Sequence, residues 1–385
     1  MYRILTLNKI SKTGLAHFDG NLFTCADDFE NPDGVIVRSA SMHEMELPDN
    51  LLAIARAGAG YNNIPVDKCT ENGICVFNTP GANANAVKEL VLCALFLTSR
   101  KIVEGAKWCE GLKGSGSEVS KKVEKGKSQF AGPEILGKTL GVVGLGAIGK
   151  KIAVSAKALG MDVIGYDPFL TQATQKELGD DVRLTADLAD IFAAADYITL
   201  HAPLNDATRG MICEKSLAGA KDGVRILNFA RAELADEADL LAALESGEVA
   251  AYATDFPTDA EIGTPGVVAI PHLGASTPEA EENCAVMAVE QISDYLKDGN
   301  VKNSVNLPAL SLPRSAAARI SVIAKADVKA AVADVLAAHG AAVAADAAAE
   351  RKGVNYLLFD TDDQIDDALI DALKAIEGIV SIRIL

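Results

Sequence analysis

Short apolar runs alternate with longer helical stretches along the first hundred residues. Residues Asn85–Lys101 repeat their apolar positions with a helical period, so they predict a helix. Strands that alternate with helices are typical of an α/β domain with a parallel sheet. The apolar runs predict strands at Arg3–Leu7, Gly34–Val37, Leu52–Ala55 and Ile74–Phe77.

The segment Glu110–Gln129 interrupts this alternation. It is rich in Gly, Ser and Lys and almost lacks apolar residues, which favours an exposed loop or an insertion between domains. Its lysines could help to gather anions, although a solvated loop is the simpler interpretation. These lysines are Lys121, Lys122, Lys125 and Lys127.

The α/β alternation resumes at Thr139. An amphipathic helix is predicted at Pro278–Lys297, because Ser276-Thr-Pro-Glu supplies capping residues and a proline in the first turn. Helices are expected between the strands that precede it. Those strands are predicted at Thr139–Val143, Asp162–Tyr166, Tyr197–Leu200, Arg225–Phe229, Ala250–Thr254 and Val267–Ile270.

The last eighty residues form a separate block. Asn306–Arg314 holds two prolines and is typical of a linker. Ile320–Leu385 predicts the order strand, helix, strand, strand, helix, strand. We therefore expect two Rossmann-like, doubly wound parallel-sheet domains and a small C-terminal α+β domain. The first would comprise residues 1–95 and 283–305, the second 96–282 and the third 306–385.

Composition narrows the range of partners. The net charge of -17 and the pI near 4.8 disfavour non-specific binding to nucleic acid or to anionic membranes. Seven cysteines without a Cys-x-x-Cys pair favour reduced thiols over disulfides or a structural zinc site. The N-terminus lacks the features of a signal peptide, and no apolar run reaches membrane-span length. We expect a cytoplasmic protein without a metal.

A glycine motif follows the strand at Thr139–Val143. Gly144, Gly146 and Gly149 form Gly-x-Gly-x-x-Gly, and a helix is expected at Lys150–Leu159. Ala147 and Ile148, between the last two glycines, are expected to bind the cofactor as well. In such a motif the first glycine permits a tight turn, the second admits a pyrophosphate and the third lets helix and strand pack closely. The helix N-terminus adds N–H donors. A glycine turn without a ligand is the alternative interpretation.

The next predicted strand ends at Asp167, 18 residues after Gly149. A carboxylate in this place binds the ribose hydroxyls of a dinucleotide and would repel a 2′-phosphate. NAD is therefore favoured over NADP as the cofactor. A plain charge at the end of a strand is the alternative.

Ordered blocks throughout residues 1–305 resemble the D-isomer-specific 2-hydroxy-acid dehydrogenases. The arrangement of three of these blocks is most similar to the branch of the family that acts on phosphoglycerate. The resemblance implies a homodimer or homotetramer that oxidises D-3-phosphoglycerate to 3-phosphohydroxypyruvate with NAD, the first step of serine biosynthesis. The blocks are VIVRSAS (35–41), ARAGAGYNNIPV (55–66), NTPGANANAVKEL (78–90), GVVGLGAIG (141–149), GYDP (165–168), ADYITLHAPL (195–204), LNFARAELAD (227–236) and PHLGAST (271–277).

The resemblance also implies three catalytic groups. His272 follows a predicted strand and precedes a glycine turn, so it suits the base that takes the hydroxyl proton. Arg231 lies just past another strand and would bind the substrate carboxylate. The family usually has a glutamate that orients the histidine. Here Asp259 stands in its place, within Phe256-Pro-Thr-Asp259-Ala, and Glu261 is an alternative.

Further residues would contact the cofactor or the substrate by the same resemblance. Asp255 would face the nicotinamide carboxamide, and Arg38 with Ser39 would meet the phosphate. Arg38 as a strand-end charge and Asn83 as a turn residue are the alternatives. The cofactor side would also include His201, Ala202, Pro203, Ala230 and Gly274, and the substrate side Gly58, through backbone N–H groups, and Asn83.

The C-terminal block resembles the small ACT domain that binds serine in some of these enzymes. The turn after its first strand, Ala324-Lys-Ala-Asp-Val-Lys329, departs from the ligand motif of that domain. A dimerising or purely structural role therefore stays as open as a regulatory one.

Two other functions stay open. The same chemistry could serve another D-2-hydroxy acid, such as glycerate, lactate or 2-hydroxyglutarate. The shorter acid at Asp259 also leaves open a dinucleotide-sensing protein without catalytic activity.

Overall fold

The computed structural model describes all 385 residues. The chain forms two compact units, of which unit 1 is Met1–Asn83 with Pro278–Leu385 and unit 2 is Ala84–Thr277. Unit 1 holds a five-stranded and a four-stranded sheet, and unit 2 holds a seven-stranded sheet. The expected α/β class with parallel sheets is confirmed. The division into three independent domains stays a prediction.

The five-stranded sheet of unit 1 is parallel throughout and has the order β2-β1-β3-β4-β5. Helix α11 (Pro278–Asp298) packs on it, with Ala288, Ile292 and Tyr295 fully buried at helical spacing. The strand order reverses between β1 and β3, so their carboxyl ends flank a crevice of the kind that binds ligands. The other elements are β1 (Tyr2–Leu7), α1 (Lys12–Leu15), β2 (Phe23–Ala26), β3 (Gly34–Val37), β4 (Ala53–Arg56), α2 (Val66–Glu71) and β5 (Cys75–Phe77).

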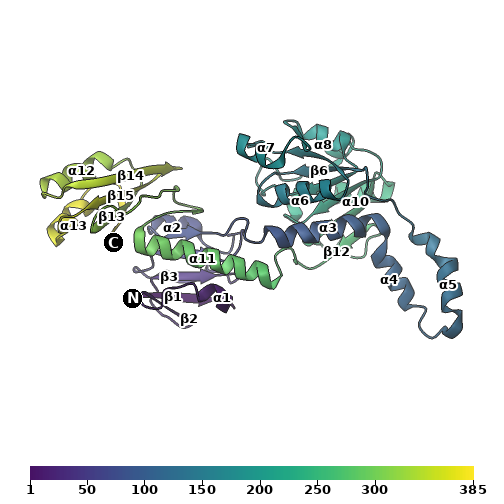
Figure 1. Ribbon diagram of the computed structural model, residues 1–385, viewed down its shortest axis with the longest axis horizontal. Helices are drawn as coiled ribbons and strands as arrows, with labels where there is room; N and C mark the ends of the chain where they lie inside the picture. The colour runs from purple at the N-terminus through teal and green to yellow at the C-terminus, as the bar shows by residue number, and fades with distance from the viewer. The chain divides into compact units, whose positions relative to one another are not determined.

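Unit 2 is a doubly wound domain. Its seven parallel strands have the order β12-β11-β10-β9-β6-β7-β8, with the reversal between β6 and β9. Helices cover both faces of the sheet (Figure 1). The strands are β6 (Thr139–Val143), β7 (Asp162–Tyr166), β8 (Arg183–Thr185), β9 (Tyr197–Leu200), β10 (Val224–Asn228), β11 (Val249–Thr254) and β12 (Val267–Ala269). The helices are α3 (Ala84–Arg100), α6 (Ala147–Ala158), α7 (Gln172–Leu178), α8 (Leu188–Ala194), α9 (Glu214–Leu217) and α10 (Glu237–Ser246).

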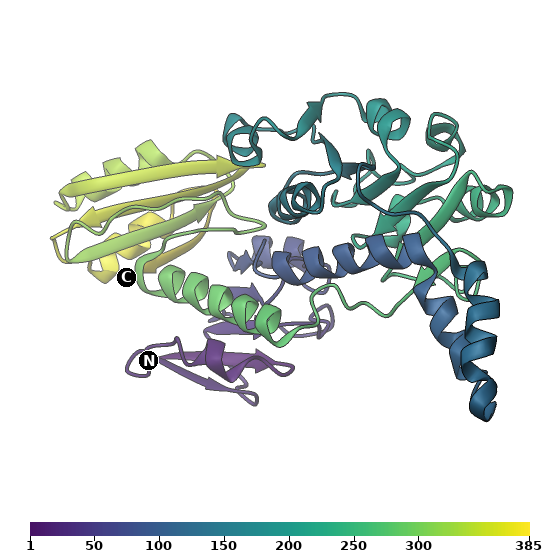
Figure 2. The ribbon, with the colours of Figure 1, turned by 45° about the vertical axis from the view of Figure 1, so that its right-hand side comes forward.

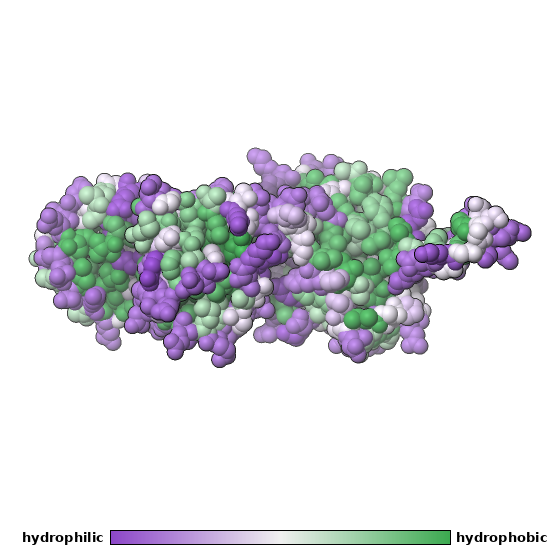
Figure 3. Space-filling view, turned by 90° about the horizontal axis from the view of Figure 1, so that it is seen from below, coloured by the Kyte–Doolittle hydropathy of each residue, from purple (hydrophilic) through white to green (hydrophobic).

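The segment Glu110–Gln129, predicted as an exposed loop or an insertion between domains, is exposed but mostly helical, so the prediction of a loop was wrong. It contains α5 (Val119–Gly126) between two short 3-10 turns and follows α4 (Ile102–Glu110). The rings of Trp108 and Phe130 lie 5.5 Å apart and join the segment's two ends. Helices α4 and α5 run side by side away from the sheet (Figures 1 and 2). The face of this helical pair that is seen in Figure 3 is largely hydrophilic. Because these two helices bury few apolar residues, their sequence lacks the apolar periodicity that predicts a helix.

The C-terminal residues follow the predicted order of strands and helices. The sheet is antiparallel, with the order β14-β15-β13-β16. Its two helices contact each other and enclose a small core of their own. The elements are β13 (Ala318–Ala324), α12 (Lys329–Ala338), β14 (Val343–Arg351), β15 (Val354–Thr361), α13 (Asp367–Lys374) and β16 (Ile379–Ile384).

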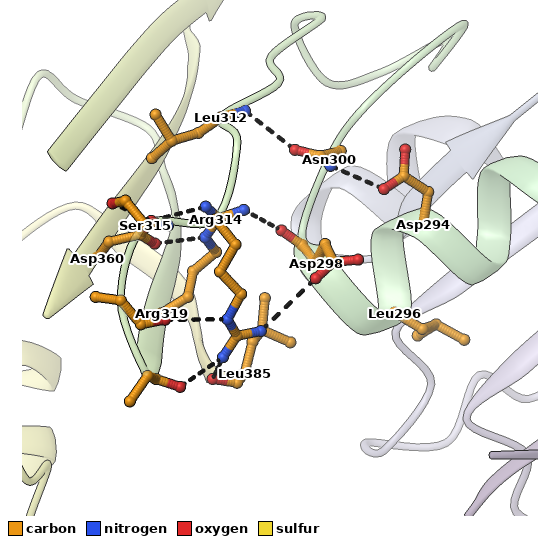
Figure 4. A network of polar contacts seen from close by, with 12 residues as sticks. Asp294, Leu296, Asp298, Asn300, Leu312, Arg314, Ser315, Arg319, Asp360 and Leu385 are labelled. Atoms are coloured by element: carbon orange, nitrogen blue, oxygen red, sulfur yellow. Dashed lines mark hydrogen bonds and ion pairs between the residues drawn. The ribbon is translucent and has the colours of Figure 1, made fainter. Parts of the chain in front are cut away.

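A buried ion pair fastens this sheet to the end of α11 (Figure 4). Arg319 is fully buried and donates to both carboxylate oxygens of Asp360, at 2.6 and 2.9 Å, and to the carbonyl of Asp298 at 2.8 Å. Burial alone would raise the pKa of Asp360, but hydrogen bonds from Arg319 and Ser315 outweigh it and hold the pKa below 3.8. The pair therefore favours the folded state at neutral pH.

We expect Asp360→Asn to lower the free energy of unfolding of unit 1 by about 3 kcal/mol, because Arg319 would stay buried without its counter-charge. Urea unfolding at pH 7 measures this. The native pKa of Asp360 is depressed, so the wild type's advantage should be complete above the pKa of the unfolded carboxyl and shrink as the pH falls.

The matched control is Lys302→Ala, which removes an exposed 4.0 Å ion pair with Asp294. It should change the free energy by less than about 0.5 kcal/mol. Equal effects of the two substitutions would contradict the role given to the buried pair.

Candidate functional site

The three glycines of the loop after β6 have different surroundings. Gly144 has a φ of +92°, and a Cβ there would lie 2.6 Å from the carbonyl oxygen of His201. A Cβ on Gly149 would lie 1.9 Å from the carbonyl oxygen of Gly144. Gly146 has no atom within 4 Å of its Cβ position. Gly144 and Gly149 therefore shape the turn, whereas Gly146 leaves an open surface that a ligand can approach.

The N-terminus of α6 faces the same loop. Gly146 is its N-cap and offers no side chain, so no side-chain bond satisfies the first amides of the helix. Ala147 is exposed and Ile148 is half-buried in this first turn. Free amides and the positive end of the helix dipole form a suitable site for a phosphate group.

Asp167 follows β7 and holds the loop in place. One carboxylate oxygen accepts from the amide of Leu145 and the other from the amide of Phe169, both at 2.8 Å. Each oxygen keeps a second lone pair, so the carboxylate can also accept from ribose hydroxyls. The loop-holding contact explains why an acid stands here whether or not a ligand is bound.

His201 closes the other side of the crevice, at the end of β9. Its amide donates to the carbonyl of Val143 at 2.7 Å, and its Nε2 forms a 2.8 Å hydrogen bond with the Thr199 hydroxyl. Burial lowers the pKa of His201 to about 3, so the imidazole is neutral at physiological pH. Ala202 and the exposed Pro203 continue along this edge.

Arg231, Phe256 and His272 come together at the same carboxyl edge of the sheet. The ring of Phe256 lies 4.3 Å from the ring of His272 and 5.6 Å from the guanidinium carbon of Arg231. The fully buried Asn228 supports the arginine loop by donating to the carbonyl of Arg231 at 2.8 Å. Arg231 also donates to the carbonyl of Ala230 at 2.6 Å. An imidazole and a guanidinium thus flank one aromatic ring.

Asp255 is buried at the end of β11 with a relative exposure of 1%. Its Oδ2 accepts from the amide of Gly274 at 2.9 Å, while its buried Oδ1 has no hydrogen-bond partner. Burial raises the pKa of this carboxyl, opposed by the Gly274 amide and by the positive charge of protonated His272. An oxygen of this kind calls for a donor from a ligand or a neighbouring side chain.

The two acids considered as partners of His272 differ in their surroundings. Asp259 is exposed and makes no hydrogen bond or ion pair within the chain. Glu261 is 4% exposed and accepts from the amide of Thr258 at 3.0 Å. Burial raises the pKa of Glu261. Neither acid contacts His272.

In unit 1, Arg38 and Ser39 follow β3 directly. Arg38 forms a 2.8 Å ion pair with Glu281, and both side chains are partly exposed. The amide of Ser39 donates to Asn8, which has a φ of +68° at the end of β1. These residues therefore lie at the reversal point of the five-stranded sheet.

A second arginine, Arg56, lies beside Arg38 and was missed from the sequence. Its Nε donates to the carbonyl of Arg38 at 3.0 Å. Gly58 has a φ of +148°, and a Cβ there would lie 1.3 Å from a guanidinium nitrogen of Arg56. The Gly58 amide donates to the carbonyl of Arg56, so the expected use of this amide for a substrate is not available in this conformation. The family resemblance identified Arg38, and a cation directly after a predicted strand is the signal that would have identified Arg56.

Asn83 is the last residue of the first segment of unit 1. Its side-chain oxygen is buried and has no hydrogen-bond partner. The preceding turn is anchored to Gly58 by the amide of Thr79, which donates to the Gly58 carbonyl at 3.0 Å. Asn83 thus keeps an unused acceptor just after this anchored turn.

Comparison with known proteins identifies unit 2. Residues 93–274 match the family described as D-isomer specific 2-hydroxyacid dehydrogenase, NAD binding domain. Unit 2 belongs to this NAD-binding domain family. The resemblance deduced from the sequence is confirmed.

Relatives extend beyond the NAD-binding domain. A D-3-phosphoglycerate dehydrogenase of Bacillus subtilis is 35% identical over 330 residues, covering 81% of this chain and 60% of the relative. Among solved structures, an NAD⁺-bound 3-phosphoglycerate dehydrogenase of Entamoeba histolytica is 27% identical, with a TM-score of 0.60, covering 80% of this chain and 99% of that one. A glyoxylate reductase from Paecilomyes thermophila is 25% identical, with a TM-score of 0.65, covering 79% and 98%.

The chain spans only 52–60% of the length of the first curated relatives that it matches. None of its helices combines the length and apolar character that a membrane span requires.

We expect Gly146→Ala to weaken NAD binding by at least about tenfold without changing thermal stability, because its methyl group would occupy only the open surface of the NAD-binding domain. Gly149→Ala should lower both binding and stability, because its Cβ meets backbone. Calorimetric titration with NAD and thermal unfolding separate the two effects. Wild-type affinity in Gly146→Ala would contradict the assignment.

Proposed function

We propose that the protein is an NAD-dependent dehydrogenase that oxidises D-3-phosphoglycerate to 3-phosphohydroxypyruvate. The observation that carries the proposal is the group of Arg231, Phe256 and His272 at the sheet edge that also holds the glycine loop. Relatives named D-3-phosphoglycerate dehydrogenase support this choice of substrate.

The residues at the crevice of unit 2 fit NAD. Its pyrophosphate would meet the amides of Gly146, Ala147 and Ile148, and its ribose would meet Asp167. The neutral His201, with Ala202, Pro203, Ala230 and Gly274, would line the remaining surface. When bound, NAD would accept the hydride from the substrate's C2.

The protein's own groups would handle the proton and the charge. His272 would take the C2 hydroxyl proton, and in the reverse direction it would return that proton to the carbonyl oxygen. Arg231 would bind the substrate carboxylate and polarise the developing carbonyl. The acid that orients His272 would be Asp259, with Glu261 as the alternative, and Asp255 would face the nicotinamide carboxamide.

The arginine pair of unit 1 would recognise the anionic ends of the substrate. Arg38 and Arg56 lie beside each other at the ends of adjacent strands, and Ser39 lies next to them. Gly58 would contribute by making room for Arg56, and Asn83 would offer its oxygen to a substrate hydroxyl. A phosphate has more charge to neutralise than a hydroxyl, which gives these arginines a role in specificity.

The C-terminal sheet would be an ACT-type domain with a ferredoxin-like order of elements. It would serve in dimerisation or regulation of a cytoplasmic homodimer or homotetramer. Its first turn, Ala324–Lys329, lacks the expected ligand motif, so dimerisation is favoured over serine binding.

One observation favours an unphosphorylated D-2-hydroxy acid as a second candidate substrate. The ion pair with Glu281 already neutralises Arg38, and a phosphate would have to displace this carboxylate. Glycerate or lactate would leave the pair intact.

We expect NADH formation with D-3-phosphoglycerate to exceed that with D-glycerate or D-lactate at least about tenfold in kcat/KM. His272→Asn should lower kcat by about 10³-fold or more while NAD affinity stays within about twofold, because His272 would transfer the proton and is not among the residues proposed to bind NAD. Absorbance at 340 nm and calorimetric titration measure these quantities. Turnover of none of these acids would favour the dinucleotide-sensing alternative.

Arg38 and Glu281 provide a test of opposite signs. Arg38→Met should raise KM for D-3-phosphoglycerate about tenfold or more, and it should leave KM for D-glycerate nearly unchanged. Glu281→Gln should lower KM for the phosphorylated substrate, because Arg38 would be released. If both variants change KM in the same direction for both substrates, Arg38 does not recognise the phosphate group of the substrate.

A further inference from the structure

The amino ends of the strands of unit 2 enclose a cavity, at the edge of the sheet opposite the glycine loop. The cavity has a volume of about 150 Å³. Its walls come from the segments before β6 and β10 and from the first residues of β9 and β10, three strands that are neighbours in the sheet. Pockets for larger metabolites have volumes of roughly 300 Å³ or more, so this cavity suits a small ion.

Three cations line this cavity. Lys138 precedes β6, Lys221 precedes β10, and Arg225 lies within β10. We propose that the cavity binds a small oxyanion, a phosphate or a carboxylate group, separately from the proposed cofactor and substrate. No residue of the cavity belongs to the candidate functional site, so this binding site can exist whether or not the proposed function holds.

Arg225 is the fixed cation of the three. Its Nε donates to the carbonyl of Thr98 at 3.1 Å, and its Nη1 donates to the carbonyl of Gly223 at 3.2 Å. Its guanidinium carbon lies 5.4 Å from the centre of the Tyr197 ring. These contacts orient the guanidinium and leave its Nη2 without a hydrogen-bond partner. An arginine held in this way loses little conformational freedom when it binds an oxyanion.

The wall behind Arg225 is fixed as well. Tyr197 is 1% exposed, and its hydroxyl shares a 2.6 Å hydrogen bond with the buried hydroxyl of Ser99 in α3. A Cβ on Gly132 would lie 1.8 Å from the carbonyl oxygen of Ser99, so the chain passes directly over the end of α3 before it reaches Pro133 at the cavity. Buried and hydrogen-bonded groups therefore define this side of the cavity.

The two acids that line the cavity do not cancel its positive charge. Asp196 accepts from a backbone amide at 2.8 Å and forms a 3.3 Å ion pair with Lys221, so these two charges neutralise each other. Asp222 is exposed and makes no ion pair. Lys138 and Arg225 have no carboxylate partner, although the chain has a net charge of -17. A local excess of positive charge in an acidic protein favours a bound anion.

The alternative is a purely structural role for Arg225 at the end of α3. A cation near the last carbonyls of a helix is favourable in itself, and the hydrogen bond to Thr98 serves this purpose. That role uses Nε and explains neither the unused Nη2 nor the two lysines beside it. An oxyanion explains all three, because a guanidinium and two ammonium groups can donate to its oxygens from several sides.

Binding can be followed at the cavity itself. In protein with ¹⁵N-labelled glycine, the amide of Gly223 reports on the cavity and the amide of Gly146 on the glycine loop. Gly223→Asn and Gly146→Ala identify the two signals. Inorganic phosphate should shift the Gly223 signal to saturation, with a dissociation constant on the order of 1 mM. Acetate, titrated in the same way, tests whether a carboxylate binds there instead.

Three substitutions test the charges. Lys138→Met should raise the phosphate dissociation constant measured at Gly223 about fivefold or more, and Asp222→Asn should lower it about twofold or more. The matched control is Lys215→Met, which removes an exposed lysine of α9 outside the cavity and should change the constant by less than about 1.5-fold. None of the three side chains makes a hydrogen bond or an ion pair within the chain, so the fold should not change.

Saturation at Gly223, with opposite effects of Lys138→Met and Asp222→Asn, is the expected result. Tighter binding of phosphate than of acetate would then identify a phosphate group as the ligand, and the reverse order a carboxylate. The absence of a saturable shift at Gly223 with both ions would overturn the proposal. Equal effects of Lys138→Met and Lys215→Met would also overturn it, because the anion would then respond only to the overall charge of unit 2.

Discussion

The close approach of β6 and β9 is the constraint on which the rest of unit 2 depends. A Cβ on Gly144 would lie 2.6 Å from the carbonyl oxygen of His201, and a Cβ on Gly149 would lie 1.9 Å from the carbonyl oxygen of Gly144. Strand, turn, helix and neighbouring strand can occupy this volume only if both positions lack side chains. Once they do, parallel strands on both sides present their carboxyl ends to one edge. The loops after β10, β11 and β12 therefore place their polar residues at this same edge of the sheet.

The contrast between overall and local charge follows from the same arrangement. The chain has a net charge of -17, yet arginines follow β3, β4 and β10 at the carboxyl ends of parallel strands. The negative surface keeps the protein from binding polyanions non-specifically, while these arginines are placed to attract a small anion. Individual carboxylates have defined partners, as Asp167 has with the glycine loop at this edge and Asp360 with Arg319 in the antiparallel sheet. The roles of the charged residues therefore depend on their positions and not on the net charge of the chain.

The inner strands could be predicted from the sequence because both of their faces are buried, so each is a continuous apolar run. The edge strands β2 and β8 were missed for the converse reason, since Phe23–Ala26 and Arg183–Thr185 mix exposed and half-buried positions. The glycine loop was predictable because its spacing records a steric requirement. The burial of the acidic residues after β11 was not predictable, because order along the chain does not tell that Asp255 and Glu261 turn inward and Asp259 outward. That depends on the path of the loop after β11, which only the coordinates reveal.

The attachment of the C-terminal sheet bears on how such a protein could have been assembled. The proline-containing linker at 306–314 resembles a boundary between domains that can be exchanged between proteins. Yet Ile323, Tyr356 and Leu358 belong to the same apolar core as Tyr295 and Leu296 of α11, and Tyr356 donates to the carbonyl of Gly299 at 2.6 Å. Removal of the C-terminal sheet at the linker would expose apolar residues on the parallel-sheet region of unit 1. A graft of this sheet from another enzyme would therefore succeed only together with the surface of α11 that receives it.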